Sequence, residues 1–311
     1  MELKQLRYLV RVAELGSINR AAGEIGIAPS ALSRQISNLE SELSTLLLQR
    51  TSSGVTLTHA GTAFMRQAHL TLRHADAAVL AAQSSRIVGQ VSVGLLPSVS
   101  TVVGLPFIEE MRRRYPRIQV KVAESLSTSL SVMLNTRQID IAVHVEEFVS
   151  TRWHAMPLLD ERLFLFGRPD MPGFPCGKHV KISQLSGLPL ILPGQTHGLR
   201  EHVNKLYTEV GNQLHVVQEI NGLDLLMELT STGIAASIHP GSAMRRATAL
   251  GMSSVELVDE QAFRRIYLAS LSESELSSCA LAARTVMDQT IEHLVASGRW
   301  PGASLLPRLD R

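Results

Sequence analysis

The sequence predicts two architectures in one chain of 311 residues: a small all-α module with a β-hairpin at the N-terminus, then a long helix and a larger α/β domain. The apolar spacing of residues 17–43 predicts two short helices separated by a tight turn. An apolar seam over residues 64–82 indicates the long helix. Strand-like and helical segments alternate from Gly89 onward, which is typical of an α/β domain.

The first of the two short helices is predicted over Ile18–Ile25. Its apolar residues lie at i, i+3, i+4 and i+7, Ser17 is a suitable N-cap, and Gly26 follows where helices commonly end in a left-handed residue. The second helix is expected from Pro29 to Leu43. Two such helices across a short turn form a helix-turn-helix, whose second helix enters the major groove of DNA.

The outer face of this second helix predicts DNA contacts. Its side chains are short hydroxyls and one guanidinium, which suit phosphate oxygens and base edges. A merely solvated face is the alternative, although such faces usually favour Glu and Lys. Residues 46–58 predict a hairpin, or wing, that meets the DNA backbone or minor groove. The residues expected to contact DNA are Pro29, Ser30, Ser33, Arg34, Ser37, Asn38, Arg50 and Thr51.

Residues 3–61 resemble the winged helix-turn-helix of LysR-type transcriptional regulators, on the segments LRYLVRVAELGS, ALSRQISNLESEL and TLTHAG. Members of that family usually open the recognition helix with Ser-Gln-Pro, where this chain has Ala28, Pro29 and Ser30. Because family members often use that Gln to contact bases, their base specificity does not transfer to this chain. Ala28 also lacks the side-chain oxygen of a good N-cap, a loss of about 1 kcal/mol.

A long helix is expected from Thr58, which can cap it, to about Ser85. Its apolar residues follow the 4-4-3-4-3 spacing of a seam for a partner helix, and the alternative is a helix packed against its own chain. In the family this helix pairs two protomers, which implies a dimer that binds a dyad-symmetric site, and two dimers would form a tetramer. The seam consists of Phe64, Ala68, Leu72, Ala75, Val79 and Ala82.

The alternation after Gly89 predicts βαβ units with mainly parallel sheets. The pattern allows one large sheet or two smaller ones, and the resemblance favours two lobes like those of a periplasmic binding protein, with crossings near Asp160–Leu163 and Phe263–Ile266. Helices are expected at Thr101–Tyr115, Ser127–Thr136, Leu199–Val210, Leu223–Ser231 and Glu275–Ala296. The expected domains are a DNA-binding module (1–58), a linker (59–88), an effector domain (89–300, with lobes of about 90–162 plus 266–300 and 163–265) and a C-terminal tail (301–311).

Three helix starts within LLPSVST, SLSTSL and PGQTHGLR offer hydroxyls beside backbone N–H groups at positive helix ends. Between two lobes they would hold a small anion, such as a carboxylate or an inorganic oxyanion. The alternatives are ordinary caps for the Ser and Thr residues and buried, hydrogen-bonded histidines at the strand ends. The candidate effector residues are Ser98, Ser100, Thr101, Ser127, Thr128, Ser129, His144, Gln195, Thr196, His197, Arg200, Asn221 and His239.

The PSVST and PGQTHGLR segments look most like the branch of the family that controls nitrogen and sulfur assimilation. Branches that sense aromatic acids use the same cleft, so the identity of the effector stays open. Operator sequence, target genes and the choice between activation and repression are equally open.

Composition and motifs exclude several other classes. Net charge is only +2, and residues 1–74 carry eight Lys/Arg against five Asp/Glu, so charge supports nucleic-acid binding only weakly. Catalytic and metal motifs are missing: there is no Gly-x-Ser-x-Gly, Walker or His-Glu-x-x-His segment, and Cys176 and Cys279 lack zinc spacing. We therefore expect no enzyme, no cofactor and no metal.

A signal peptide and an apolar run of membrane-spanning length are also missing, so we expect a cytoplasmic protein that does not bind membranes. The expected partners are double-stranded promoter DNA, a small-molecule effector (an anion or organic acid), RNA polymerase, and further copies of the chain. The alternatives are a DNA-binding protein without an effector and a solute-binding protein.

Overall fold

The computed structural model describes residues 1–51, 54–65, 67–68, 71–72, 75, 87–145, 153–271 and 276–307. The chain forms two compact units, Met1–Ser84 and Ser85–Arg311, and the boundary falls within the segment expected to be the linker. Among the described residues, no helix is both long and apolar enough to cross a membrane.

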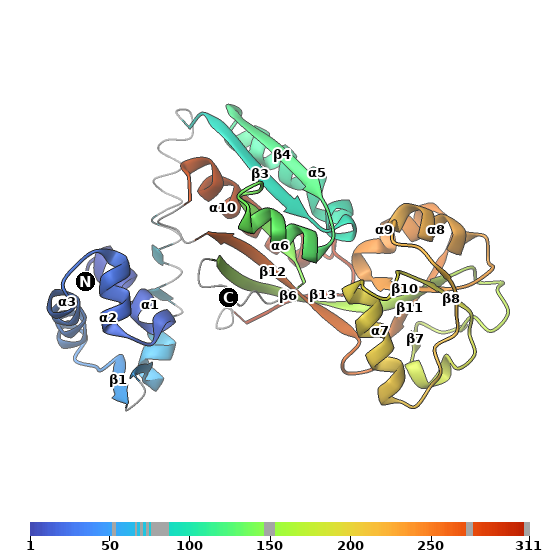
Figure 1. Ribbon diagram of the computed structural model, residues 1–311, viewed down its shortest axis with the longest axis horizontal. Coiled ribbons are helices and arrows are strands. Elements are labelled where there is room, and N and C mark those ends of the chain that lie inside the picture. The colour runs from blue at the N-terminus through green and yellow to red at the C-terminus, as the bar shows by residue number, and fades with distance from the viewer. Residues whose placement is uncertain are drawn as a thin grey trace. The chain divides into compact units, whose positions relative to one another are not determined.

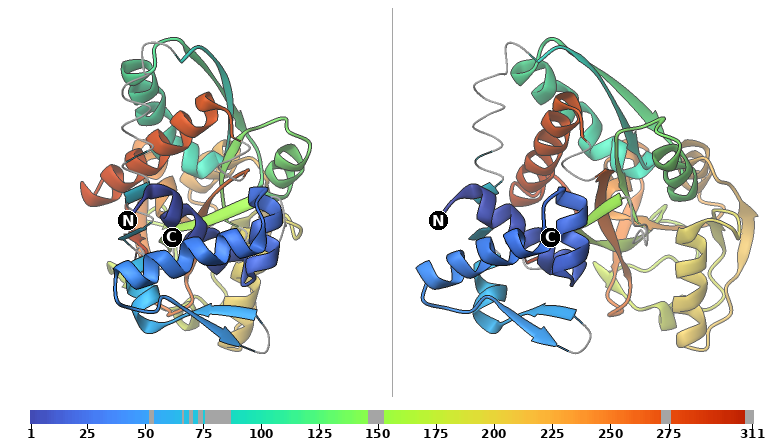
Figure 2. Two further views of the ribbon diagram at one scale, coloured as in Figure 1. Left: turned by 90° about the vertical axis from the view of Figure 1, so that its left-hand side faces the viewer. Right: turned by 60° about the vertical axis from the view of Figure 1, so that its left-hand side comes forward.

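In the described part of the first unit, three helices precede a hairpin, and a further helix begins after it (Figure 1). The two short helices form where the sequence predicts them: the Ser17 side chain accepts a hydrogen bond from the Arg20 N–H at 3.4 Å, and Gly26 ends the helix with a left-handed φ of 76°. Figure 2 shows the hairpin projecting from one side of the helices. The elements are α1 (Leu3–Leu15), α2 (Ile18–Ile25), α3 (Pro29–Glu42), β1 (Leu48–Thr51) and the antiparallel β2 (Gly54–Leu57).

One apolar core holds these elements together. Each helix contributes one buried face, as its spacing predicts, and the predicted inner side of α3 is buried at Leu32, Ile36 and Leu39. Leu43 is only partly buried and packs at the edge of the core. The fully or nearly fully buried members are Tyr8, Leu9, Val12, Ala21, Ala22, Leu32, Ile36, Leu39 and Leu47.

The linker helix starts as expected, because Thr58 Oγ1 accepts the Gly61 N–H at 2.9 Å and residues 59–65 are helical. A Cβ at Gly61 would lie 1.9 Å from the Leu47 carbonyl oxygen, so only glycine permits this approach. The first seam residues are Phe64, Ala68 and Leu72, and they pack with Leu6 of α1. This part of the seam therefore packs against its own chain, which was the alternative to a partner helix. Val79, Ala82 and the far end of the expected helix lie outside the described residues.

The first half of the second unit follows the predicted alternation of strands and helices. Strand β3 pairs in parallel with both β4 and β5. Helices α5 and α10 lie side by side on one face of these strands, and α6 lies on the other (Figures 1 and 2). The elements are β3 (Gly89–Leu95), α5 (Pro97–Arg114), β4 (Ile118–Glu124), α6 (Ser127–Asn135), β5 (Ile141–His144) and α10 (Ser278–Ala296).

Two long strands connect the halves of this unit, and here the prediction of mainly parallel sheets is wrong. β6 (Trp153–Gly167) and β12 (Phe263–Leu271) run antiparallel, because one carries the chain into the second half and the other brings it back. β6 changes partners along its length: residues 153–162 pair with β12, and residues 163–167 pair with β10 and β11. The two groups of strands therefore share β6.

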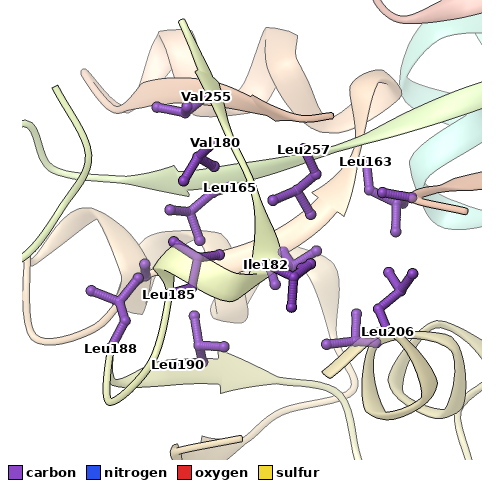
Figure 3. Close-up of a cluster of buried hydrophobic side chains, with 14 of the residues drawn as sticks. Leu163, Leu165, Val180, Ile182, Leu185, Leu188, Leu190, Leu206, Val255 and Leu257 are labelled. Carbon is purple, nitrogen blue, oxygen red and sulfur yellow. The ribbon is translucent and has the colours of Figure 1, made fainter. Parts of the chain in front are cut away.

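The second half has its own apolar core between β6 and α7, drawn in Figure 3, where Leu163, Leu165, Ile182 and Leu206 converge. A short parallel pair, β8 with β9, adjoins the larger sheet through a parallel bridge between Leu190 and Ala236. The elements are β7 (His179–Val180), η1 (Ile182–Gln184), β8 (Leu190–Leu192), α7 (Gly198–Glu209), β9 (Val216–Glu219), α8 (Leu223–Ser231), β10 (Ser237–Pro240), η2 (Gly241–Ala243), α9 (Met244–Ala249) and β11 (Ser253–Leu257).

The C-terminal residues correct another expectation. Residues 301–311 were expected to be a tail, but Ala303–Leu305 form β13, which pairs with β6. Trp300, just before this strand, is 2% exposed and anchors the segment. Residues 308–311 lie outside the described residues.

Candidate functional site

The face of α3 opposite the core is open to solvent. Pro29, Ser30, Arg34, Ser37 and Asn38 are exposed, and Ser33 is half-buried. Arg34 makes no ion pair with any residue that the structure describes. The two hairpin residues predicted to contact DNA, Arg50 and Thr51, end strand β1.

A hollow of about 370 Å³ lies between the hairpin and the first turns of α2 and α3. Helix starts carry partial positive charge and unpaired N–H groups, which suit a phosphate. The sequence predicted three of the lining residues, Pro29, Ser33 and Thr51. It did not predict Asn19, although Asn19 lies only two residues after the N-cap Ser17. The hollow is lined by Ser17, Ile18, Asn19, Pro29, Ser33, Thr51, Gly54 and Val55.

Glu40, the carboxylate that ends the polar face of α3, has a structural task. Its Oε1 accepts the N–H groups of Leu47 at 2.7 Å and Leu48 at 2.9 Å, which attaches the start of β1 to α3. The carboxylate is thus engaged by backbone donors. From Pro29 to Asn38 the face carries neutral or positive side chains, and Glu42 at the end of the helix pairs with the N-terminal ammonium group of Met1.

In the second unit, two predicted effector residues at the start of α5 contact the other half of that unit. Thr101 Oγ1 donates to the Ser98 carbonyl at 2.7 Å or to the Ser242 carbonyl at 2.9 Å. The buried Ser98 accepts a hydrogen bond at its Oγ from Arg264 Nη2 at 2.9 Å. The start of α5 is therefore bonded both to η2 and to β12.

These contacts surround a buried ion pair that the sequence analysis missed. Glu161 on β6 is fully buried, and its Oε2 accepts from Arg264 at 2.8 Å. Its Oε1 accepts the Ser242 N–H at 2.6 Å and the Trp300 indole N–H at 2.9 Å. The sequence could have indicated this pair, because Glu161 and Arg264 are charged residues within largely apolar strands, and such residues are rarely buried unless paired.

Two of the predicted histidines, His197 and His239, are influenced by the charge of Arg264, and the third, His144, packs on Tyr267. His197 is the N-cap of α7, where its Nδ1 accepts the Leu199 N–H at 3.1 Å. Burial, and then the charge of Arg264, lower the pKa of His197. Burial, followed by His197 and Arg264, lowers the pKa of His239 to about 3. His144 stacks on Tyr267 with ring centroids 6.2 Å apart, and burial lowers its pKa to about 4.

Other predicted effector residues have different partners or point to solvent. Arg200 bonds to the Pro193 carbonyl at 3.1 Å, Asn204 at 2.9 Å and Glu219 at 3.0 Å, beside an open hollow of about 550 Å³ along α7 and β9. Asn221 Oδ1 accepts the Gly194 N–H at 2.9 Å. Ser100 donates to Glu124 at 2.5 Å, Ser127 is buried, and Thr128, Ser129, Gln195 and Thr196 are exposed.

Within the described part of the chain, no group of three or more His, Cys, Asp or Glu side chains is arranged to hold a metal ion. Cys176 is exposed and Cys279 is buried, and both are free thiols.

Two protein-family descriptions match the chain. "Bacterial regulatory helix-turn-helix protein, lysR family" matches residues 3–62, and "LysR substrate binding domain" matches residues 84–294. The chain is 33% identical over 248 residues to the nitrogen assimilation regulatory protein nac of Klebsiella aerogenes. The aligned region covers 79% of this chain and 80% of that protein.

Solved structures of similar architecture include full-length BenM, with 25% identity, a TM-score of 0.59, and coverage of 97% of this chain and 99% of BenM. Full-length CbnR complexed with its target DNA has 22% identity, a TM-score of 0.53, and coverage of 96% of this chain and 99% of CbnR. At that identity the CbnR likeness concerns the fold alone.

Proposed function

This chain belongs to the LysR family of DNA-binding transcriptional regulators, and from that premise we propose which of its side chains bind DNA and which bind an effector. The outer face of α3 enters the major groove, with Arg34 contacting base edges. Ser30, Ser33, Ser37 and Asn38 bind phosphates or bases, and Arg50 and Thr51 of the wing bind the neighbouring backbone. The observation that supports this most is the exposed face of α3 from Pro29 to Asn38, which carries no carboxylate and lies opposite the buried face of the helix.

Arg34 provides the sharpest test of the DNA-binding proposal. Arg34→Ala removes one good base contact, worth about 1–3 kcal/mol, so operator affinity should fall roughly 5- to 150-fold at fixed salt. Arg112→Ala is the matched control, because it removes an exposed arginine from the second unit. Equal operator binding by wild type and Arg34→Ala in a fluorescence-anisotropy titration would show that the recognition face is misassigned.

We further propose that the protein acts in the cytoplasm as a homodimer or tetramer, with paired linker helices placing two modules on a dyad-symmetric promoter site. A single module contacts too few base pairs for specificity, which is the physical reason for pairing. Changes in module spacing would then alter access of RNA polymerase to the promoter. Sedimentation of the free protein and of its operator complex tests the stoichiometry.

The effector proposal places a small anion or organic acid between the halves of the second unit, beside Ser98, Thr101, His197 and His239. Its support is the convergence of polar groups from both halves around Arg264. A bound effector should raise the unfolding temperature of the full chain by mass action. A screen of organic acids and oxyanions, followed by operator binding with each hit, tests this proposal.

A regulator without a small-molecule effector is the second candidate, and one observation favours it. Ser98 and Thr101 already have hydrogen-bond partners within the chain, so the halves are held together without a ligand. Specific operator binding that no compound in the screen alters would support this candidate. The proposal of a solute-binding protein has less support, because a helix-turn-helix unit does not contribute to solute binding. We propose a regulatory rather than a catalytic role for both units.

A further inference from the structure

The C-terminal segment contacts both halves of the second unit. It follows α10 of the first half, and its first residue, Trp300, is buried. The Trp300 indole N–H donates to Glu161 Oε1 at 2.9 Å, on the part of β6 that pairs with β12. Just after β13, the Leu306 N–H donates to the Leu158 carbonyl at 3.0 Å. We call residues 300–306 the clasp.

The middle of the clasp packs against the second half. A Cβ at Gly302 would lie 2.6 Å from the ring of Phe164, and a Cβ at Gly241, which begins η2, would lie 1.9 Å from the Pro301 carbonyl oxygen. Neither position has room for a side chain, so the clasp and the second half approach more closely than side chains would permit. The Gly302 carbonyl also accepts the Arg162 N–H at 2.8 Å, at the point where β6 passes from one half to the other.

These contacts add a third crossing to the two strands that carry the chain between the halves. Two paired strands, β6 and β12, allow the bodies that they connect to bend and rotate. The clasp is fixed to the first half through α10 and to the second half through its contacts with Phe164 and Gly241. The Trp300 bond acts in the same way, because Glu161 Oε1 also accepts the Ser242 N–H of η2 at 2.6 Å. Rotation of one half against the other must therefore break contacts of the clasp.

We propose that the clasp is a conformational restraint, which holds the two halves in one arrangement and lets them rotate about β6 and β12 when it is released. The clasp thereby contributes to the free-energy difference between the arrangement in this structure and a more open one. The part of the chain that matches the LysR substrate binding domain ends at residue 294, so the clasp lies beyond it. The proposal concerns the second unit alone and holds whatever ligand or operator the protein binds.

The test measures the distance between the halves in the full-length protein, by double electron–electron resonance between two spin labels. One label is attached to Cys176, which is exposed in the second half, and the other to an Arg112→Cys variant, at an exposed position of α5 in the first half. Every sample also carries Cys279→Ala, so that this buried thiol is not labelled. Labelled protein is diluted with unlabelled protein, so that each measured distance arises within one chain.

The first matched pair of variants concerns the two tryptophans of the chain. Trp300→Phe keeps an aromatic ring in the clasp and removes the hydrogen bond to Glu161. Trp153→Phe is the control, because the Trp153 indole N–H donates to Asn135 Oδ1 at 2.8 Å, a bond between β6 and α6 that stays within the first half.

The second matched pair concerns two glycines with the same backbone conformation. Gly298 and Gly302 have left-handed φ angles of 68° and 69°, so alanine strains the backbone equally at both. A Cβ at Gly302 collides with Phe164, whereas a Cβ at Gly298 meets no atom within 4 Å. Gly302→Ala therefore displaces the clasp without removing any of its polar groups, and Gly298→Ala is its control.

The wild type and both controls should give one narrow distribution of distances, and both clasp variants should give a broader or shifted one. Hydrogen exchange of the Arg162 and Leu306 amides is the second measurement. Trp300→Phe removes a hydrogen bond to a charged acceptor, so these amides should exchange about tenfold faster or more. The proposal is overturned if either clasp variant keeps the wild-type distances, if its control changes them as much, or if the two amides of Trp300→Phe exchange at the wild-type rate.

Discussion

The outer face of α3 and the cluster of Arg264, Glu161, Ser98, Ser242 and Trp300, which we call the Arg264 site, present their polar groups in opposite ways. The side chains on α3 are exposed and await a partner, while those of the Arg264 site are largely buried and already bonded to one another. Binding of DNA to α3 therefore adds contacts without breaking hydrogen bonds that already exist within the protein. Binding a ligand at the Arg264 site must exchange existing contacts, which makes the second site suited to a change in conformation.

This difference predicts the largest effect at Glu161. Glu161→Ala removes the acceptor of Arg264, the Ser242 N–H and the Trp300 indole, and leaves a partly buried arginine without its counter-charge. Removing one partner of a buried pair typically costs about 3–5 kcal/mol of unfolding free energy. Urea unfolding of the second unit measures this loss. If the unfolding free energy changed by less than about 1 kcal/mol, the ion pair between Glu161 and Arg264 would not be what holds the two halves together.

Glu161→Ala should hardly change the affinity of the first unit for DNA, because Glu161 lies in the second unit. Arg34→Ala, conversely, should reduce operator binding without lowering the unfolding free energy, because exposed side chains contribute little to stability. If either variant affected both properties equally, the two regions would not act independently.

Acid sensitivity is the next effect in size, and it belongs to the second unit. The folded pKa values of His144 and His239 are lowered to about 4 and about 3, below the ordinary value of about 6.5. As the pH falls below about 6.5, the unfolded chain therefore binds more protons, and the unfolding free energy decreases until the folded histidines titrate. Above that pH both states are neutral and the contribution is constant.

His239→Leu isolates one histidine from the other titrating groups. The slope of unfolding free energy against pH between about 6 and 4 should become shallower by up to about 1.4 kcal/mol per pH unit. Urea unfolding at several pH values, with wild type in parallel, provides the slopes. Parallel curves would show that His239 is charged or solvated in the folded protein.

The smallest expected effect is a gain in stability in the first unit. Ala28 is the N-cap of α3 and makes no side-chain cap bond, so Ala28→Ser should stabilise this unit by about 1 kcal/mol. Thermal unfolding of the first unit's helices, compared with Ala28→Gly, measures the gain. No gain over Ala28→Gly would show that the Ser hydroxyl cannot reach an N–H of the first turn.

The two regions also differ in how far the sequence predicts them. Ser17, Gly26 and the apolar positions of α3 act within one or two helical turns, so local spacing was enough to predict the helix-turn-helix. The hydrogen bonds that join Ser98, Glu161, Arg264 and Trp300 span 103 to 166 residues of sequence, and no local pattern encodes such contacts. Hydroxyls at helix starts predicted Ser98 and Thr101 as site residues but not their bonds to one another.

Long-range pairing also explains the errors in the predicted architecture. β6 and β12 read as ordinary strands, and nothing in their spacing shows that they run antiparallel through both halves. Likewise, Ala303–Leu305 is too short to predict as a strand, and it exists because β6 offers it an edge and Glu161 binds the preceding Trp300.

Binding of the purified protein to the DNA upstream of its own gene, at fixed salt and with excess non-specific competitor, tests the central claim most directly. Nuclease footprinting should show a protected site with dyad symmetry whose half-sites are about one helical turn, or a multiple of one, apart. Weak binding that added salt abolishes, there and in a genome-wide selection of bound sites, would contradict the claim that α3 recognises a specific sequence.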